Sequence, residues 1–120
     1  MKIINVFTPN GNSYQLELCD TFGKKLLGLM FRKSLPEKHG LLFEYTNESI
    51  INTSIHMFFM NFPITVVWVN QQNIVVDKKI ALVWHPYYAS GTPASKVIET
   101  GVSSFDDFVI GEQLSLAYEK

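Results

Sequence analysis

Four polar side chains, spread through a largely apolar sequence, are the residues best suited to chemistry. His56 stands at the head of the run HMFFMNFPITVVWV, with Arg32 and Glu44 before it and Glu99 after it. An imidazole beside a carboxylate can transfer protons near neutral pH, and a guanidinium can bind a carboxylate or a phosphate. If Arg32, Glu44 and His56 converge in one open pocket, the sequence predicts a hydrolase- or isomerase-like enzyme that uses His56 with a carboxylate.

Arg32 and His56 also have a structural interpretation, which we favour. Arg32 follows a predicted helix, where it can cap backbone carbonyls or pair with Glu44 as a tie between elements. His56 lies where a predicted strand changes from having one solvent-exposed face to being buried on both faces. We therefore expect a largely buried, neutral ring that is hydrogen-bonded to backbone. Glu44 and Glu99 form the one carboxylate pair to test for acid–base catalysis.

The segment WHPYY, residues 84–88, is the richest candidate for a contact surface. Trp84 and Tyr87, with His85 between them, offer flat and stiff contact area suited to sugars, peptides or a partner protein. Alternatively, this loop folds back and plugs the end of the β-domain. The sequence leaves both interpretations open.

Other chemistries have no motif to support them. His39, His56 and His85 lie far apart, and no Cys-x-x-Cys pair occurs, so we expect no metal site and no cofactor. Cys19 ends an amphipathic strand and reads as a core or rim residue rather than a nucleophile. The sequence also lacks a glycine-rich phosphate loop and a dinucleotide fingerprint.

Composition and length set the class of protein. A chain of 120 residues with 47% hydrophobic and 18% charged residues predicts one globular domain, residues 1–120. A net charge of −1 gives no electrostatic reason to bind nucleic acid or a membrane surface. The single cysteine excludes an internal disulfide, and no signal peptide or spanning segment is evident, so we expect a cytoplasmic protein.

Alternating apolar and polar residues dominate the sequence and predict short strands. The segments 1–7 and 13–19 flank an Asn-Gly turn and predict an N-terminal hairpin. The period changes within 20–31, where Asp20 or Thr21 can cap one short helix that ends near Gly28. Further strands are predicted at 41–45, 50–60, 62–69, 74–83, 96–100, 105–110 and 113–119, which gives eight or nine in all.

These elements predict a mainly β fold with one short helix. The expected architecture is a small antiparallel β-sandwich or a partly closed, jelly-roll-like barrel. Its core should bury large apolar side chains from several of the elements. We expect Leu29, Phe43, Ile55, Met57, Phe59, Val66 and Trp68 to be largely buried.

Three stretches of the chain resemble the domain-of-unknown-function 192 family: GLMFRKSLPEKHGLLFEY, then IHMFFMNFPITVVWVNQQNIVVDKK, and later VIETGVSSF followed by IGE. The resemblance covers residues 2–117 and keeps the family's order of blocks. It implies a small jelly-roll-type β-sandwich with one short helix and no established biochemical activity. Many members carry leader sequences; in lacking one, this chain is similar to shorter intracellular members, archaeal ones among them.

The chain departs from that family at two places. Where many members have Trp-Met-Lys-Asn-Thr, residues 56–60 read His-Met-Phe-Phe-Met, and Thr65 stands where members have Asp after Pro-Leu. Any shared chemistry must then rest on Arg32, Glu44, His56 and Glu99.

We therefore expect a small-ligand- or partner-binding β-domain. The alternatives are the enzyme that uses His56 with a carboxylate, and a structural subunit whose aromatic loop is an oligomer contact. The partner is an unknown small molecule or protein, a second copy of the chain included. The candidate ligand contacts are Arg32, Glu44, His56, Trp84, His85 and Tyr87.

Overall fold

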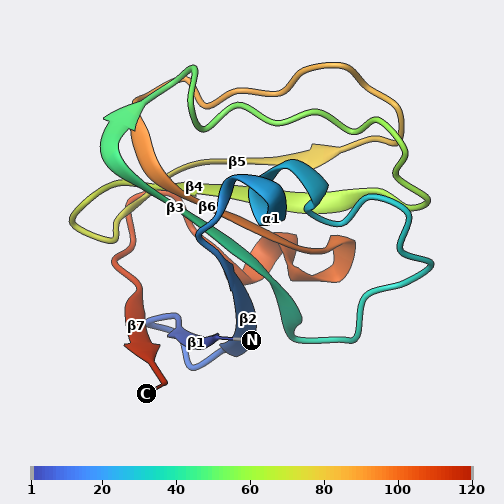
Figure 1. Cartoon of the computed structure of the whole chain (residues 1–120). Helices are drawn as coiled ribbons and strands as arrows, with labels where there is room; N and C mark the ends of the chain where they lie inside the picture. The colour runs from blue at the N-terminus through green and yellow to red at the C-terminus, as the bar shows by residue number, and fades with distance from the viewer. Residues whose placement is uncertain (1, 120) are drawn as a thin grey trace.

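Seven strands form one mixed sheet in the computed structural model, which describes residues 2–119, although not the side chains of Phe22 and Leu26 (Figure 1). The sheet order is β5-β4-β6-β3-β2-β1-β7. One α-helix and one 3-10 helix complete the fold. The elements are β1 (Ile3–Phe7), β2 (Ser13–Cys19), α1 (Phe22–Leu27), β3 (His39–Ser49), β4 (Ile64–Val69), β5 (Val75–Ala81), β6 (Ala94–Gly101), η1 (Val102–Asp107) and β7 (Ser115–Tyr118).

The predicted mainly β fold with a short α-helix is confirmed, but the prediction of an all-antiparallel sheet is wrong. Strand β3 pairs parallel to β2, with Leu18 opposite Leu42. Parallel neighbours need a crossover connection, and here α1 and the segment after it provide one. The sheet is not closed into a barrel, and its seven strands are fewer than the eight or nine predicted.

The N-terminal hairpin and the helix form where the sequence predicts them. Strands β1 and β2 pair antiparallel around a turn in which Gly11 has a φ of 94°. The Thr21 hydroxyl accepts a hydrogen bond from the Lys24 amide and caps α1. Gly28, at φ 49°, ends the helix and donates its amide hydrogen to the Lys24 carbonyl. Local sequence signals are sufficient to place these elements.

Two predicted strands are wrong. Residues 105–110 belong in part to the 3-10 helix η1, and residues 50–60 form turns with one isolated bridge between Ile55 and Tyr88. The Met60 amide bonds to the Met57 carbonyl, which closes a turn where the alternation predicts a ladder. Phe59 adopts a φ of 62° inside that turn and is 47% exposed, so its predicted burial is also wrong.

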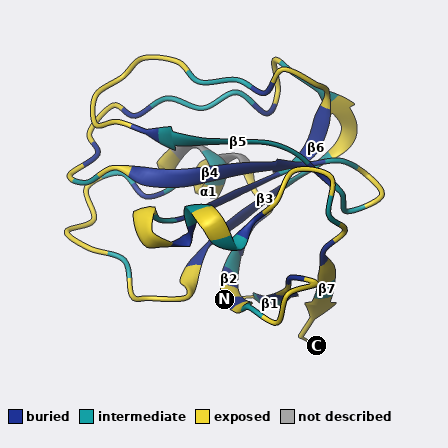
Figure 2. Cartoon of the chain, turned by 180° about the vertical axis from the view of Figure 1, so that it is seen from behind, coloured by how far each residue is buried: buried dark blue, intermediate teal, exposed yellow. Residues whose placement is uncertain are grey.

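The core covers both faces of the sheet, and β4 is buried at every position (Figure 2). Successive residues of a strand point to opposite faces, so Val67 joins one apolar cluster and Val66 the other. The first cluster joins side chains of β1, β2, β4 and β6 to Phe108, and the second packs the sheet against residues that follow α1. Of the predicted core, Leu29, Phe43, Met57, Val66 and Trp68 are buried, and Ile55 is half-buried against the second cluster.

No helix within residues 2–119 is both long enough and apolar enough to cross a membrane.

Candidate functional site

A pocket of about 80 Å³ lies on the face of the sheet that carries the second apolar cluster. Such a volume holds several water molecules or a small chemical group. The strands β3 and β6 supply one wall, and α1 with the turn after it supplies another. The segment 54–60 completes the lining. The lining residues are Lys25, Leu27, Gly28, Leu29, Met30, Phe43, Tyr45, Ser54, Ile55, His56, Met57, Met60, Val97 and Glu99.

Glu99 is the acidic residue of this pocket. It sits in β6 in register with Leu41 of β3 and Val66 of β4, so its side chain shares the face of those two apolar residues. Only 7% of Glu99 is exposed, and its carboxyl receives no hydrogen bond from residues 2–119. Burial raises the pKa of Glu99 to about 7 because the charged form loses its hydration. The carboxyl can therefore gain or lose a proton near neutral pH.

Lys25 and Tyr45 form a cation–π contact in the lining of the pocket. The Lys25 ammonium lies 4.1 Å from the centroid of the Tyr45 ring, which is a favourable distance for a cation–π contact. Burial, followed by the nearby Glu99 carboxylate, raises the pKa of the Tyr45 hydroxyl. No ion pair within 4.0 Å joins Lys25 to Glu99 in the described part of the chain. The ammonium of Lys25 and the carboxyl of Glu99 line one pocket without neutralising each other in a salt bridge.

His56 reaches the same pocket from the segment 54–60. Its ring is half-buried, and Nδ1 accepts a hydrogen bond of 3.2 Å from the Phe58 amide. The predicted hydrogen bond between this ring and backbone is therefore present. Because Nδ1 acts as the acceptor, a neutral ring carries its proton on Nε2. The carboxyl that shares a pocket with His56 is that of Glu99 rather than Glu44.

Arg32 and Glu44 do not line the pocket with His56. The guanidinium of Arg32 forms an ion pair of 3.6 Å with Glu17 of β2. Glu44 accepts a hydrogen bond from the Tyr118 hydroxyl, and it points to the face of β3 opposite to that of Phe43. The convergence on which the enzyme hypothesis with Glu44 depended is absent, and Glu44 and Glu99 lie on opposite faces of the sheet.

Trp84 belongs to an exposed aromatic cluster, which we define as Phe31, Phe58, Phe59 and Trp84. The ring of Phe59 lies 5.2 Å from Phe31 and 5.0 Å from Trp84, measured between centroids. These three residues all have a positive φ, between 61° and 66°. A left-handed backbone is costly for a bulky side chain, so the fold holds these rings outward at an energetic cost.

The loop that carries Trp84 exposes some of its aromatic rings to solvent and packs another against the core. Tyr87 is exposed like Trp84, whereas the His85 ring stacks on Tyr88 with centroids 4.4 Å apart. Tyr88 packs against the second apolar cluster, and its hydroxyl accepts a hydrogen bond from the Leu82 amide. The loop is thus anchored by Tyr88 and leaves Trp84 and Tyr87 available for contact.

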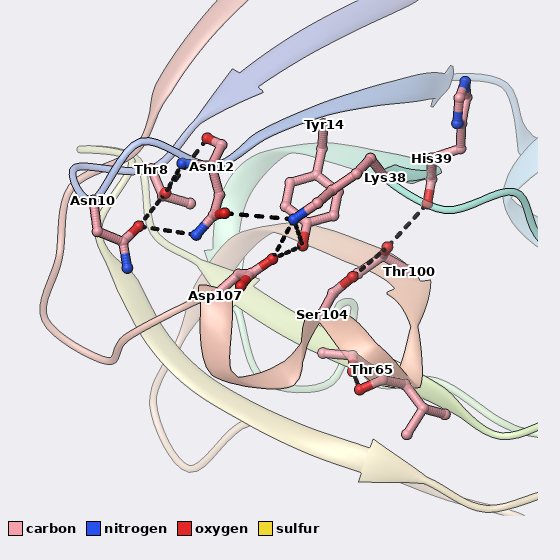
Figure 3. Close-up of polar contacts among 11 residues, drawn as sticks. Thr8, Asn10, Asn12, Tyr14, Lys38, His39, Thr65, Thr100, Ser104 and Asp107 are labelled. Atoms are coloured by element: carbon pink, nitrogen blue, oxygen red, sulfur yellow. Dashed lines mark hydrogen bonds and ion pairs between the residues drawn. The ribbon is translucent and has the colours of Figure 1, made fainter.

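A second group of polar side chains, drawn in Figure 3, joins the N-terminal hairpin to η1. The Lys38 ammonium lies 2.7 Å from Asp107, and the Tyr14 hydroxyl donates to the same carboxylate. Burial acts to raise the pKa of Asp107, but the hydrogen bonds from Lys38 and Tyr14 outweigh it and lower the pKa. Because these groups satisfy one another, this network acts as a structural tie, although an open groove of about 540 Å³ adjoins it.

Sequence reasoning included Glu99 in a carboxylate pair but missed Lys25 and Tyr45 as its companions. A signal for Glu99 was present, since a carboxylate directly after the apolar residues Val97 and Ile98 has no obvious partner. No local signal links Lys25 to Tyr45, because their proximity depends on how the helix packs on the sheet.

Comparisons with known proteins agree with this fold. A family model described as "DUF192: Uncharacterized ACR" matches residues 5–116. A "UPF0127 protein" of Thermococcus gammatolerans is 43% identical over 72 residues, 60% of this chain but only 46% of that protein, so the match spans less than half of the relative. A "UPF0127 protein" of Pyrococcus furiosus is 33% identical over 97 residues, 81% of this chain and 80% of that one. A crystal structure of a protein of unknown function from Novosphingobium aromaticivorans shares the fold with a TM-score of 0.82 at 19% identity, covering 94% of this chain and 83% of the other.

Proposed function

The chain belongs to the DUF192 family, for which no function is established, and on that premise we propose that it is a small-ligand-binding domain whose binding site is the Glu99 pocket. The blocks by which the chain resembles the family contribute lining residues from separate parts of the sequence. Gly28 comes from the first block, His56 from the second and Glu99 from the third. A fold that gathers them around one cavity supports binding there.

The observation that carries this proposal is the buried carboxyl of Glu99. A buried polar group without a hydrogen bond costs on the order of 1–3 kcal/mol, more if it is charged, so such groups are rare in folded proteins and call for an explanation. The carboxyl oxygens of Glu99 keep slight access to the cavity that they line, so Glu99 bears part of such a cost. A ligand that hydrogen-bonds to the carboxyl would recover part of that cost. Thioether and aromatic side chains around it, including Met57 and Phe43, would cover the apolar part of the ligand.

The three methionines other than Met1 provide the test, because Met30, Met57 and Met60 all line the pocket. We would label methionine methyl groups with ¹³C and record their NMR resonances against a panel of small amines, alcohols, amides and carboxylic acids. A compound that binds in the pocket shifts these resonances in a saturable way. Its affinity should fall in a Glu99→Gln variant.

The matched control for that variant is Glu44→Gln, which makes the same chemical change on the opposite face of the sheet. It should leave the affinity unchanged. If no compound class shifts the methionine methyl groups, or if both variants bind equally well, the pocket is not a ligand site and the proposal fails.

A second candidate is a proton-transfer enzyme of the hydrolase or isomerase type. The observation in its favour is that His56 and Glu99, whose pKa of about 7 suits a general acid or base, line one pocket. Any ligand found in the NMR screen would be incubated with the protein and followed for conversion. Loss of conversion in Glu99→Gln, with binding retained, would favour this candidate over simple binding.

The aromatic cluster supports a separate contact with a partner, and a second copy of the chain remains one such partner. Exposed aromatic rings are typical of interaction surfaces.

We also propose the cytoplasm as the compartment of this protein, because Cys19 is the single cysteine and free thiols persist in a reducing environment.

A further inference from the structure

Going further into the Glu99 pocket, and resting on its proposed role as a ligand site, we infer that the pocket selects an alkylammonium group. The group would place its positive charge between the Glu99 carboxylate and the aromatic walls of the pocket. Neutral and anionic ligands of the same size would bind less tightly.

The first step concerns the charge that the pocket lacks. Glu99 is 7% exposed, and no cation among the described residues forms an ion pair with it. A buried carboxylate is stabilised by a close positive charge or by several hydrogen-bond donors. An ammonium group supplies both, because it carries one positive charge and donates up to three hydrogen bonds.

The second step concerns the walls of the pocket. Phe43 and Tyr45 lie in β3 on the same face as Leu41, the register partner of Glu99. An aromatic face attracts a cation, and the attraction grows when the cation is desolvated. The thioethers of Met57 and Met60 are polarisable and also line the pocket. The lining therefore combines a carboxylate with soft, electron-rich surfaces, which is the chemistry that recognises organic ammonium ions.

The third step is that one ring of the pocket already holds an ammonium. Lys25 lies 4.1 Å from the centroid of the Tyr45 ring, which places a cation of the chain itself in the lining. Gly28 leaves room on the same side, since even an added Cβ would stand 3.8 Å from Glu99 Oε1. A ligand ammonium would take the deeper position beside the carboxyl, where Lys25 forms no ion pair.

The test uses the full chain at pH 8, where Glu99 is mostly ionised, and compares ethylammonium, ethanol and acetate as near-isosteric probes. Dissociation constants would come from the ¹³C-methyl shifts of the methionines. We expect ethylammonium to bind at least about tenfold more tightly than ethanol, within the range of a desolvated cation–π contact with a carboxylate. Acetate should bind more weakly than ethanol. If ethanol or acetate binds as well as ethylammonium, the pocket is a ligand site without cation selectivity and this inference is wrong.

Two variants and one control sharpen the result. Glu99→Gln should remove the preference for ethylammonium, and Glu44→Gln should keep it. Lys25→Met should raise the affinity for ethylammonium, because it removes a like charge from the lining of the pocket. A preference that survives Glu99→Gln would overturn the inference. If none of the three probes shifts the methionine methyl groups, and no compound of the wider panel does, the proposed ligand site fails as well.

The ammonium can belong to a free amine or to the lysine side chain of another protein. Butylammonium and Nα-acetyl-lysine amide share the same cationic tip, so their affinities separate the two sources. Equal affinities assign the pocket to a free amine, and tighter binding of the lysine derivative assigns it to a lysine side chain. If neither binds more tightly than butanol, the ammonium assignment is wrong.

Discussion

Glu99 lies against Gly28, since a Cβ added to Gly28 would stand 3.8 Å from Glu99 Oε1 and 3.5 Å from the ring of Phe43. Gly28 also has a φ of 49°, where an L side chain is strained. Because ψ is −129°, outside the left-handed helical region, we expect Gly28→Ala to destabilise the protein by about 1–3 kcal/mol through that backbone strain. Urea denaturation would measure the change, with Gly23→Ala as control because a Cβ there meets nothing within 4 Å. If Gly28→Ala and Gly23→Ala have the same free energy of unfolding, the backbone strain assigned to position 28 is wrong.

The raised pKa of Glu99 makes stability depend on pH in a defined direction. The folded pKa of about 7 exceeds the ordinary value of 4.5, so the folded state binds more protons than the unfolded state between these pH values. The free energy of unfolding should therefore fall as the pH rises from about 4.5 to 7, by on the order of 3 kcal/mol for this residue. Chemical denaturation at pH 5, 6, 7 and 8 would measure that slope.

Glu99→Gln should flatten this slope and should make the protein more stable than the parent at pH 8, because the amide is never charged. Glu44→Gln should leave the slope in place. If the slope from pH 5 to 8 is the same in the parent and in Glu99→Gln, the carboxyl of Glu99 does not titrate near neutrality.

The turn residues Met57 and Phe59 should differ sharply in their contribution to stability. Met57 is 1% exposed, and replacing it with alanine should cost roughly 2–5 kcal/mol. Phe59 is 47% exposed on a left-handed backbone, so Phe59→Gly should cost far less, since glycine relieves the strain. Thermal and urea denaturation of both variants would show the contrast. A near-neutral Met57→Ala would contradict the packing of this turn on the sheet.

The exposed rings of the loop, Trp84 and Tyr87, should matter for association and not for folding. Trp84 and Tyr87 are 55% and 54% exposed, so Trp84→Ala and Tyr87→Ala should weaken a self or partner interaction and leave the melting temperature nearly unchanged. Sedimentation at several concentrations, alongside thermal melting, separates the two effects. A large drop in melting temperature with unchanged association would mean that the loop plugs the fold.

A matched control for these two variants is Tyr88→Ala, in the same loop. Tyr88 packs inward, and its hydroxyl binds the Leu82 amide, so this change should lower the melting temperature.

Local sequence patterns were enough to predict the elements that depend on near neighbours along the chain. The alternation in 13–19, the Thr21 cap and the glycine at 28 predicted β2 and α1, because turns, caps and amphipathic periods act within a few residues. The sequence also predicted the burial of Met57 and Trp68, because burying large apolar side chains is favourable, although Phe58 and Phe59 of the same run are 39% and 47% exposed.

Tertiary structure decided what depends on partners distant in the sequence. A segment with alternating residues, such as 50–60, becomes a strand only if another strand pairs with it, and here the segment forms turns instead. The parallel pairing of β2 with β3 likewise follows from where the crossover returns to the sheet. The contacts of the candidate site residues also depend on tertiary structure. Arg32 forms its ion pair with Glu17, and Lys25 lies over the ring of Tyr45. Glu99 lies beside residues of α1 and of the segment 54–60 only because folding brings these three distant parts of the chain around one cavity. The sequence specifies which charged and polar side chains are present. The distances between them and the local dielectric constant, which set the strength of their interactions, arise only on folding.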